Sequence, residues 1–154
     1  FNLEPDPETL ANIAIQMADA VKELDVEPRV AMISYSNFGS VAHPAPRGIA
    51  RAVDIVRTQR PDLEIDGEMR PEVALDVDRR NEHFPFSRLT KAANVLVFPT
   101  LAAGNATYQT LKTVGGAETL GPMLLGLKKP CAALPIDADV DDIVNMTAYL
   151  ASRP

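Results

Sequence analysis

The sequence predicts an α/β protein built on a doubly wound parallel sheet. Two observations predict this class. Short, continuously apolar runs recur at residues 30–33, 63–65, 95–98, 123–125 and 131–134, and such runs are typical of strands that are covered on both faces. Stretches with helical spacing of apolar residues separate most of these runs. Strands that alternate with helices indicate a parallel sheet with helices packed on it.

The helical stretches carry their own start signals. A first helix is predicted from Asp6-Pro7-Glu8 onward, because Asp can cap a helix, Pro suits its first position and a carboxylate favours the positive end of the helix dipole. Apolar residues recur at helical spacing over residues 49–56, 108–112 and 143–150. Asn105 precedes the second of these stretches, and we expect it either to cap that helix or to contact a ligand.

Composition excludes several classes of protein. With 15 Lys and Arg against 21 Asp and Glu, the net charge of −6 provides no basic field for a nucleic-acid partner. No apolar run approaches the roughly 20 residues needed to cross a bilayer, so no membrane partner is expected. The single cysteine, Cys131, cannot form an intrachain disulfide or a zinc cluster, which suits a reducing cytoplasm. Because Cys131 lies in an apolar run, we expect its thiol to be buried and unreactive. The chain starts without a methionine and is expected to be a fragment.

Candidate ligand contacts lie in the loops that follow the strands, because ligands of open α/β sheets bind beyond the carboxyl ends of the strands. The loop 34–40 carries hydroxyls, an amide and Gly39, and is expected to be either an anion-binding loop or a plain strand-to-helix turn. Asp66 and Glu68 flank Gly67. They are interpreted either as an acid/base pair or, preferably, as residues of a solvated turn or a subunit contact. No acidic cluster has the spacing of a calcium loop, so no metal site is expected.

Six segments resemble, in the same order, successive motifs of the phosphotransacetylase family. They are residues 30–40, 61–68, 93–99, 103–105, 121–126 and 142–145. The resemblance implies that family's fold, a three-layer α/β architecture like that of isocitrate and isopropylmalate dehydrogenases, in two lobes. Residues 1–127 would form the second lobe, and residues 128–154 would form a strand and helix that return to the first lobe.

Two details favour the branch of this family that forms the C-terminal region of bacterial NADP-dependent malic enzymes. The loop Ser36-Asn37-Phe38-Gly39-Ser40 stands where acetyltransferases usually have Ser-Thr-Lys-Gly-Ser, and the last helix contains Ile-Val-Asn-Met-Thr-Ala at 143–148. The acetyltransferases also carry a Ser-Arg pair after the last strand and an Asp early in the last helix. The corresponding residues here are Pro135, Ile136 and Asp142, so only the Asp is retained. No residue of this chain is therefore expected to be catalytic.

The resemblance implies a regulatory domain that senses acetyl-CoA, or a related acyl-CoA, and joins subunits into a homo-oligomer. The parent protein would convert malate to pyruvate and CO2, with NADP and a divalent metal held in an N-terminal region outside this chain, and no cofactor is expected within it. Two alternatives stay open: a working phosphate acetyltransferase and a purely structural dimerisation domain.

The resemblance implies ligand contacts at Ser36, Asn37, Ser40, Asn105, Tyr108 and Asp142, and the charge of Lys112 adds it to this set. On charge alone, Lys112, Arg88 or Lys128 would hold the phosphates of the ligand.

Overall fold

The structure is a computed structural model that describes residues 2–136 and 138–153. The chain forms two compact units, Phe1–Thr107 and Tyr108–Pro154. The predicted boundary between residues 127 and 128 concerns the lobe to which each segment belongs in a two-lobed parent. The division into compact units falls inside one helix and concerns contacts within this chain, so it does not test to which lobe a segment belongs. The boundary at residues 127 and 128 therefore stays a prediction.

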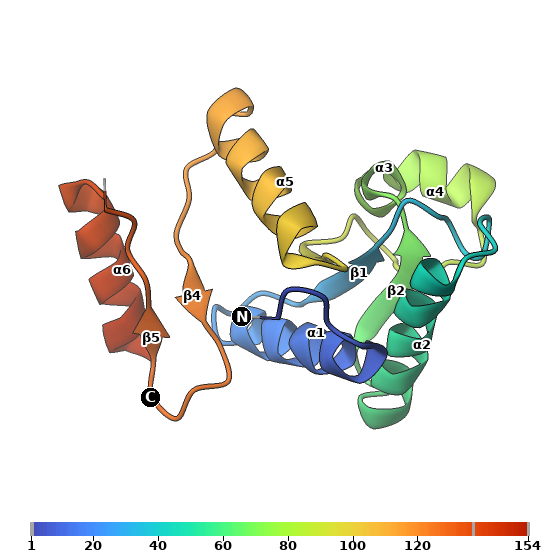
Figure 1. Cartoon of the computed structure of the whole chain (residues 1–154), viewed down its shortest axis with the longest axis horizontal. Coiled ribbons are helices and arrows are strands. Elements are labelled where there is room, and N and C mark those ends of the chain that lie inside the picture. The colour runs from blue at the N-terminus through green and yellow to red at the C-terminus, as the bar shows by residue number, and fades with distance from the viewer. Residues whose placement is uncertain (1, 137, 154) are drawn as a thin grey trace. The chain divides into compact units, whose positions relative to one another are not determined.

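The first unit is built on a parallel sheet of three strands in the order β2-β1-β3 (Figure 1). The strands are β1 (Arg29–Ile33), β2 (Glu64–Met69) and β3 (Val95–Val97). Strand β1 is continuously apolar because both of its faces are covered, as predicted. Val30 and Met32 lie in the core on one face of the sheet, while Ala31 and Ile33 lie in the core on the other. The prediction of a parallel α/β sheet is confirmed for this unit.

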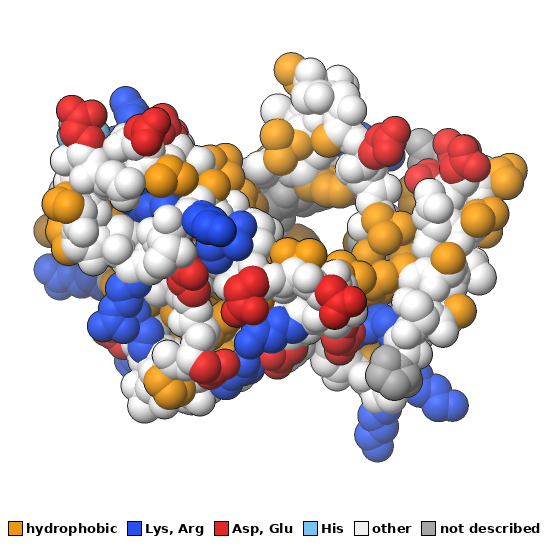
Figure 2. All heavy atoms as spheres, turned by 180° about the vertical axis from the view of Figure 1, so that it is seen from behind, with side chains coloured by type: hydrophobic (Ala, Val, Ile, Leu, Met, Phe, Trp, Pro, Cys, Tyr) orange, Lys and Arg blue, Asp and Glu red, His pale blue; other side chains and the backbone are white. Residues whose placement is uncertain are grey.

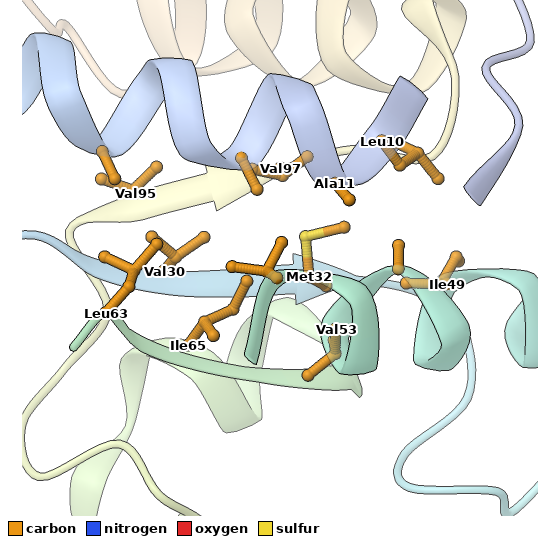
Figure 3. Packing of buried hydrophobic residues seen from close by; sticks show 14 residues of the cluster. Leu10, Ala11, Val30, Met32, Ile49, Val53, Leu63, Ile65, Val95 and Val97 are labelled. Atoms are coloured by element: carbon orange, nitrogen blue, oxygen red, sulfur yellow. The ribbon is translucent and has the colours of Figure 1, made fainter. Parts of the chain in front are cut away.

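Two long helices, α1 (Pro7–Lys22) and α2 (Pro44–Gln59), pack on the face of the sheet that carries Met32. Figure 3 shows the side chains of this core gathered between the two helices and the strands. Helix α1 begins as predicted, with Asp6 as its cap: the Asp6 carboxylate accepts the N–H of Thr9 at 2.8 Å. Alanines line the buried side of α1, and their small side chains let the helix backbone approach the sheet closely. These are Ala11, Ala14 and Ala18, all fully buried.

Two short helices, α3 (Pro71–Leu75) and α4 (Val77–His83), lie after β2, and Val73 of α3 belongs to the core on the opposite face of the sheet. They were not predicted from the sequence, because five and seven residues are too few to show a helical stripe. Arg80 of α4 is 0% exposed and donates hydrogen bonds to the four backbone carbonyls of Val73, Ala74, Leu89 and Lys91. It thereby ties the segment after α4 to α3.

The described residues of the second unit form a two-stranded sheet and one complete helix. Its elements are β4 (Met123–Leu124), β5 (Cys131–Ala132) and α6 (Val140–Ser152), and it also takes the second half of α5 (Leu101–Val114). The prediction that residues 123–125 and 131–134 belong to the parallel sheet was wrong for both. β4 and β5 pair with each other in antiparallel fashion, as the short connection between them requires.

Cys131 was also predicted wrongly. It is exposed, because a two-residue strand with a single neighbour covers little of its surface.

The surface of the first unit is mixed in charge. On the face that Figure 2 shows, basic and acidic side chains are interspersed, without a field of one sign. Several of these charges form ion pairs, such as Arg51 with Glu8 and Arg60 with Asp19. Among the described residues, no helix combines the length and the apolar character that a membrane span requires.

Candidate functional site

The loop that follows β1 is held in place by a buried carboxylate at the end of β2. Ser36 is 0% exposed and Glu68 is 2% exposed. The Ser36 hydroxyl donates to Glu68 Oε1 at 2.8 Å, and the Gly39 N–H donates to the same oxygen at 2.7 Å. The Val41 N–H in turn donates to Ser36 Oγ at 3.1 Å. An anion-binding role for this loop was left open by the sequence, and the anion that the loop holds in the structure is the protein's own Glu68.

Further bonds define the shape of this loop. The Asn37 side-chain carbonyl accepts the Arg70 N–H at 2.7 Å, and Ser40 Oγ accepts the Asn37 N–H at 2.9 Å. Phe38 and Gly39 both lie in the left-handed region, with φ of 47° and 83°. Glycine adopts this region without cost, whereas Phe38 is held there by its contacts. Its N–H donates to the Glu68 backbone carbonyl at 2.8 Å.

The three ligand contacts predicted on this loop differ in accessibility. Ser36 and Asn37 are buried, and their side chains are engaged within the loop and with β2 and the residue after it. Ser40 is exposed, although its hydroxyl already accepts the Asn37 N–H. In this conformation Ser36 and Asn37 shape the loop, and a ligand would meet Ser40 and the exposed Tyr35. Contact of these residues with a ligand stays a prediction.

An open pocket of about 340 Å³ lies beside the same loop. Its walls come from the loop after β1, the first turns of α2 and the end of β2. The lining residues are Phe38, Gly39, Val41, Ala42, Pro46, Arg47, Ala50, Gly67 and Glu68. Two of them are charged, Arg47 and Glu68. The pocket therefore combines apolar walls with one cation and one buried carboxylate.

Asp66 and Glu68 do not lie on a solvated turn, so that part of the preferred interpretation was wrong, while a subunit contact of these residues stays a prediction. Both belong to β2 and are buried, Asp66 at 4% exposure. Asp66 Oδ1 pairs with Arg57 at 2.6 Å, while Oδ2 accepts the Ser87 hydroxyl at 2.8 Å and the Arg88 N–H at 2.7 Å. Asp66 is thus fully engaged by its neighbours, and its role is to join β2 to α2 and to the segment after α4.

Asn105 was expected either to cap a helix or to contact a ligand, and it is not a cap. Helix α5 begins at Leu101, so Asn105 lies inside it, exposed. Thr100 serves the helix start instead, because its hydroxyl accepts the Ala103 N–H at 3.2 Å. Farther along α5, Tyr108 is half-buried and Lys112 is exposed.

Residues 135–142 contain the positions where the resemblance places the acyl-transfer residues. Pro135 and Ile136 are both exposed, while Asp137 lies outside the described residues. Asp142 forms a capping box with Asp139 at the start of α6. The Asp142 N–H donates to Asp139 Oδ1 at 2.8 Å, and Asp142 Oδ2 accepts the Asp139 N–H at 3.3 Å. Asp142 therefore already has a role in starting the helix.

The predicted ligand contacts fall into two sets. Ser36, Asn37, Ser40 and Asn105 belong to the first unit, and the others, Tyr108, Lys112 and Asp142, belong to the second. That both sets touch one ligand stays a prediction. Within residues 2–136 and 138–153, no three side chains of the kinds that ligate metals lie together.

Replacing Asn37 with alanine tests the role of the loop. The Arg70 N–H would lose its acceptor, and a buried donor left unpaired costs about 1–3 kcal/mol. We expect the free energy of unfolding, measured by urea denaturation, to fall by about that amount. Tyr35→Ala is the matched control. Tyr35 is an exposed neighbour in the same loop, so a change within about 0.5 kcal/mol is expected. Equal effects of the two changes would contradict the role assigned to Asn37.

Together, the parallel sheet and the loop packed against its strand ends define an α/β protein whose candidate site lies at the carboxyl edge of the sheet. The chain belongs to the Phosphate acetyl/butaryl transferase family, whose sequence profile matches residues 1–151. The resemblance found in the sequence is thereby confirmed.

Relatives of two kinds are similar to this chain. A phosphate acetyltransferase of Paracoccus denitrificans is 43% identical over 152 residues, which are 98% of this chain and 48% of the relative. An NADP-dependent malic enzyme of Escherichia coli (strain K12) is 43% identical over 149 residues, 96% of this chain and 20% of the relative. The structure also resembles that of a phosphotransacetylase from Streptococcus pyogenes, with a TM-score of 0.93 and 32% identity over 99% of this chain and 46% of the other.

The chain spans about half the length of the acetyltransferase and about a fifth of the malic enzyme. It thus corresponds to one phosphotransacetylase-like region that occurs both in acetyltransferases and inside larger malic enzymes.

Proposed function

We propose that this chain is the regulatory, acetyl-CoA-sensing and oligomerising region of an NADP-dependent malic enzyme, and that it does not itself catalyse acyl transfer. The observation that carries the proposal is the pair Pro135-Ile136 at the positions of the family's Ser-Arg pair. Proline has no hydroxyl for the thiol of CoA, and isoleucine has no guanidinium for a phosphate. Because the loss of one charge-stabilising donor lowers a rate by about 10²–10³, acyl transfer would be very slow or absent.

Ligand binding does not depend on those two groups, since uniform binding of a substrate is separate from stabilisation of its transition state. Acetyl-CoA or a related acyl-CoA would contact the exposed Ser40 and Lys112, with Tyr108 half-buried nearby in sequence. For the domain to regulate, acetyl-CoA must bind two states of the oligomer with different affinity, typically by about 1–3 kcal/mol. Malate oxidation, NADP and the divalent metal belong to residues outside this chain, in a cytoplasmic protein.

We also propose the finer fold expected from the family, with residues 1–127 in the second of two doubly wound lobes and residues 128–154 returning to the first. The composition of α6 supports this arrangement. Only Met146 and Tyr149 of that helix are buried, whereas Ile143 and Val144 are exposed on it. Exposed aliphatic side chains on a short helix favour packing against a further part of the protein.

An active phosphate acetyltransferase is the second candidate. The Paracoccus acetyltransferase is as similar to this chain as the E. coli malic enzyme, at 43% identity each. A purely structural dimerisation domain is the third candidate, and it would need neither acyl transfer nor acetyl-CoA binding.

An assay of acetyl phosphate formation from acetyl-CoA and phosphate separates these candidates. With the intact polypeptide that carries this chain, we expect turnover at least about 10²-fold below that of the Paracoccus enzyme assayed beside it. We also expect malate oxidation to slow when acetyl-CoA is added. Turnover close to that of the control enzyme would overturn the regulatory proposal. If calorimetry detects no acetyl-CoA binding and malate oxidation is unaffected, the dimerisation candidate is left.

A further inference from the structure

The pocket beside the loop after β1 is lined by the buried carboxylate of Glu68, of which one oxygen accepts hydrogen bonds from the described chain and the other does not. Glu68 Oε1 accepts two hydrogen bonds, from the Ser36 hydroxyl and the Gly39 N–H. Oε2 accepts none from the described part of the chain, and it is not one of the buried unpaired atoms, which are Arg57 Nε and Arg80 Nε. Part of the small exposed surface of Glu68, 2% of the residue, therefore belongs to Oε2, and Glu68 is one of the residues that line the pocket.

Glu68 is also a buried charge without a counter-ion. Both donors to Oε1 are neutral, and no Lys, Arg or His of the described chain forms an ion pair with it, in contrast to Asp66 and its partner Arg57. Buried charges are normally paired, because removing an ion from water is costly. A cationic group that enters the pocket and donates to Oε2 would supply both the missing hydrogen bond and the missing charge.

Arg47 provides the opposite charge at the same pocket. It lies in the first turn of α2, its side chain is exposed, and within the described residues its guanidinium has no carboxylate partner. The neighbouring Arg51, by contrast, is paired with Glu8. A guanidinium presents paired N–H groups that match a carboxylate in a two-point contact. Arg47 is therefore suited to an anionic group on the same ligand.

The rest of the pocket is apolar. Phe38, Val41, Ala42, Pro46 and Ala50 supply its walls. The volume of about 340 Å³ lies at the small end of the range of roughly 300–1,000 Å³ usual for ligand sites. The site thus suits a molecule of a few heavy atoms with a hydrocarbon body.

We infer that this pocket binds a small aliphatic α-amino acid. Its ammonium group donates to Glu68 Oε2, its carboxylate pairs with Arg47, and its side chain packs against Val41 and Pro46. This site would be an effector site in the first unit. It uses neither Lys112 nor Asp142, and it does not rest on the proposal that the domain senses acetyl-CoA.

Calorimetry on the intact protein with three matched probes tests the inference. L-Leucine carries both charged groups, 4-methylpentanoate lacks the ammonium, and isopentylamine lacks the carboxylate. We expect leucine to bind, and each of the other two to bind at least about tenfold more weakly. No heat with leucine at tens of millimolar would overturn the inference. So would equal affinity for the amine or the acid, or equally tight binding of inorganic phosphate.

Two variants and one control locate the site. Arg47→Gln is expected to weaken leucine binding about tenfold or more, and it changes an exposed side chain that the fold does not need. Arg51→Gln, one helical turn away on the same helix and outside the pocket, should leave the affinity for leucine unchanged. Ala50→Leu should abolish binding by filling the pocket. Unchanged leucine affinity in both Arg47→Gln and Ala50→Leu would overturn the assignment. These variants avoid Glu68, whose replacement would also disturb the loop.

Discussion

Replacing Arg80 with methionine is expected to lower the free energy of unfolding by about 3–5 kcal/mol. Arg80 is 0% exposed, and its guanidinium donates to four backbone carbonyls. The Ala74 carbonyl would keep a second donor, the Ala93 N–H at 2.9 Å. The carbonyls of Val73, Leu89 and Lys91 would lose the guanidinium donor. Each buried polar group left unpaired costs about 1–3 kcal/mol, and methionine fills the space without replacing any donor. Native domains are stable by only about 5–15 kcal/mol, so this change removes a large share.

Urea denaturation followed by circular dichroism measures the effect. Arg79→Met is the control. Arg79 is the adjacent residue of α4, and its side chain is exposed, so a change within about 0.5 kcal/mol is expected. Arg80→Lys should be nearly as destabilising as Arg80→Met, because one ammonium cannot reach carbonyls on both sides as the forked guanidinium does. A small effect of Arg80→Met would show that water satisfies these carbonyls in its place.

Burial also acts on the charge of Arg80. Desolvation lowers the pKa of its guanidinium, while the carboxylates of Asp66, Glu64 and Asp76 oppose that shift. The guanidinium of arginine stays protonated at ordinary pH even so. Arg80 is thus a permanently charged residue placed among backbone carbonyls, and its contribution to stability comes through directed hydrogen bonds.

The parts of the fold that could be predicted from the sequence are those set by local patterns. The apolar run of β1 marks a strand buried on both faces, and Asp6-Pro7 marks the start of α1, because both signals depend only on neighbouring residues. The end of β2 could not be predicted in this way. Asp66 and Glu68 resemble turn residues, and only partners far along the chain, such as Ser36 and Arg57, make their burial possible.

The same limit explains what the sequence did not reveal about the candidate site. Ser36, Asn37 and Ser40 were identified as a group because they follow a strand, and that placement is correct. Arg47, which lines the pocket, was not proposed as a ligand contact, and Glu68 was considered only as one half of an acid/base pair with Asp66. Arg47 has the sequence context of an ordinary surface residue on a helix, and nothing local marks it as unpaired. Arg80, in the polar stretch Asp-Arg-Arg-Asn-Glu, likewise resembles a solvated helix face.

The second unit shows a related difficulty. The runs that became β4 and β5 are as apolar as true core strands, but the exposed Leu134 and Cys131 show that this short hairpin does not bury them. Apolar composition indicates a need for burial without indicating which partner supplies it. That partner lies beyond the local pattern, and the proposed first lobe would provide it.

Gly67→Ala is expected to destabilise the protein by several kcal/mol and to disturb the pocket at the same time. The backbone of Gly67 has φ of 141°, a conformation almost restricted to glycine, and a non-glycine residue there costs about 1–3 kcal/mol. A Cβ at this position would also lie 2.7 Å from the Met32 carbonyl oxygen and 2.9 Å from Met32 Cβ. Met32 is buried in the central strand and cannot move away freely, so overpacking adds about 1–3 kcal/mol.

Two other glycines separate these contributions. At Gly39, φ is 83° and no atom lies within 4 Å of the place that an alanine Cβ would take, so Gly39→Ala should show the backbone cost alone. Gly48 lies inside α2 with ordinary φ, and the atom nearest to an added Cβ, Pro7 Cγ, is 3.7 Å away. Gly48→Ala should therefore stabilise the protein by about 0.4–1 kcal/mol. Measured by urea denaturation, the order of stability should be Gly48→Ala, wild type, Gly39→Ala and then Gly67→Ala. Equal stability of the Gly67→Ala and Gly39→Ala proteins would contradict the expected overpacking, because it would mean that Met32 moves away from the added Cβ. Since Gly67 lies between Asp66 and Glu68 in β2, it would also mean that the end of the strand that holds the Glu68 carboxylate can shift.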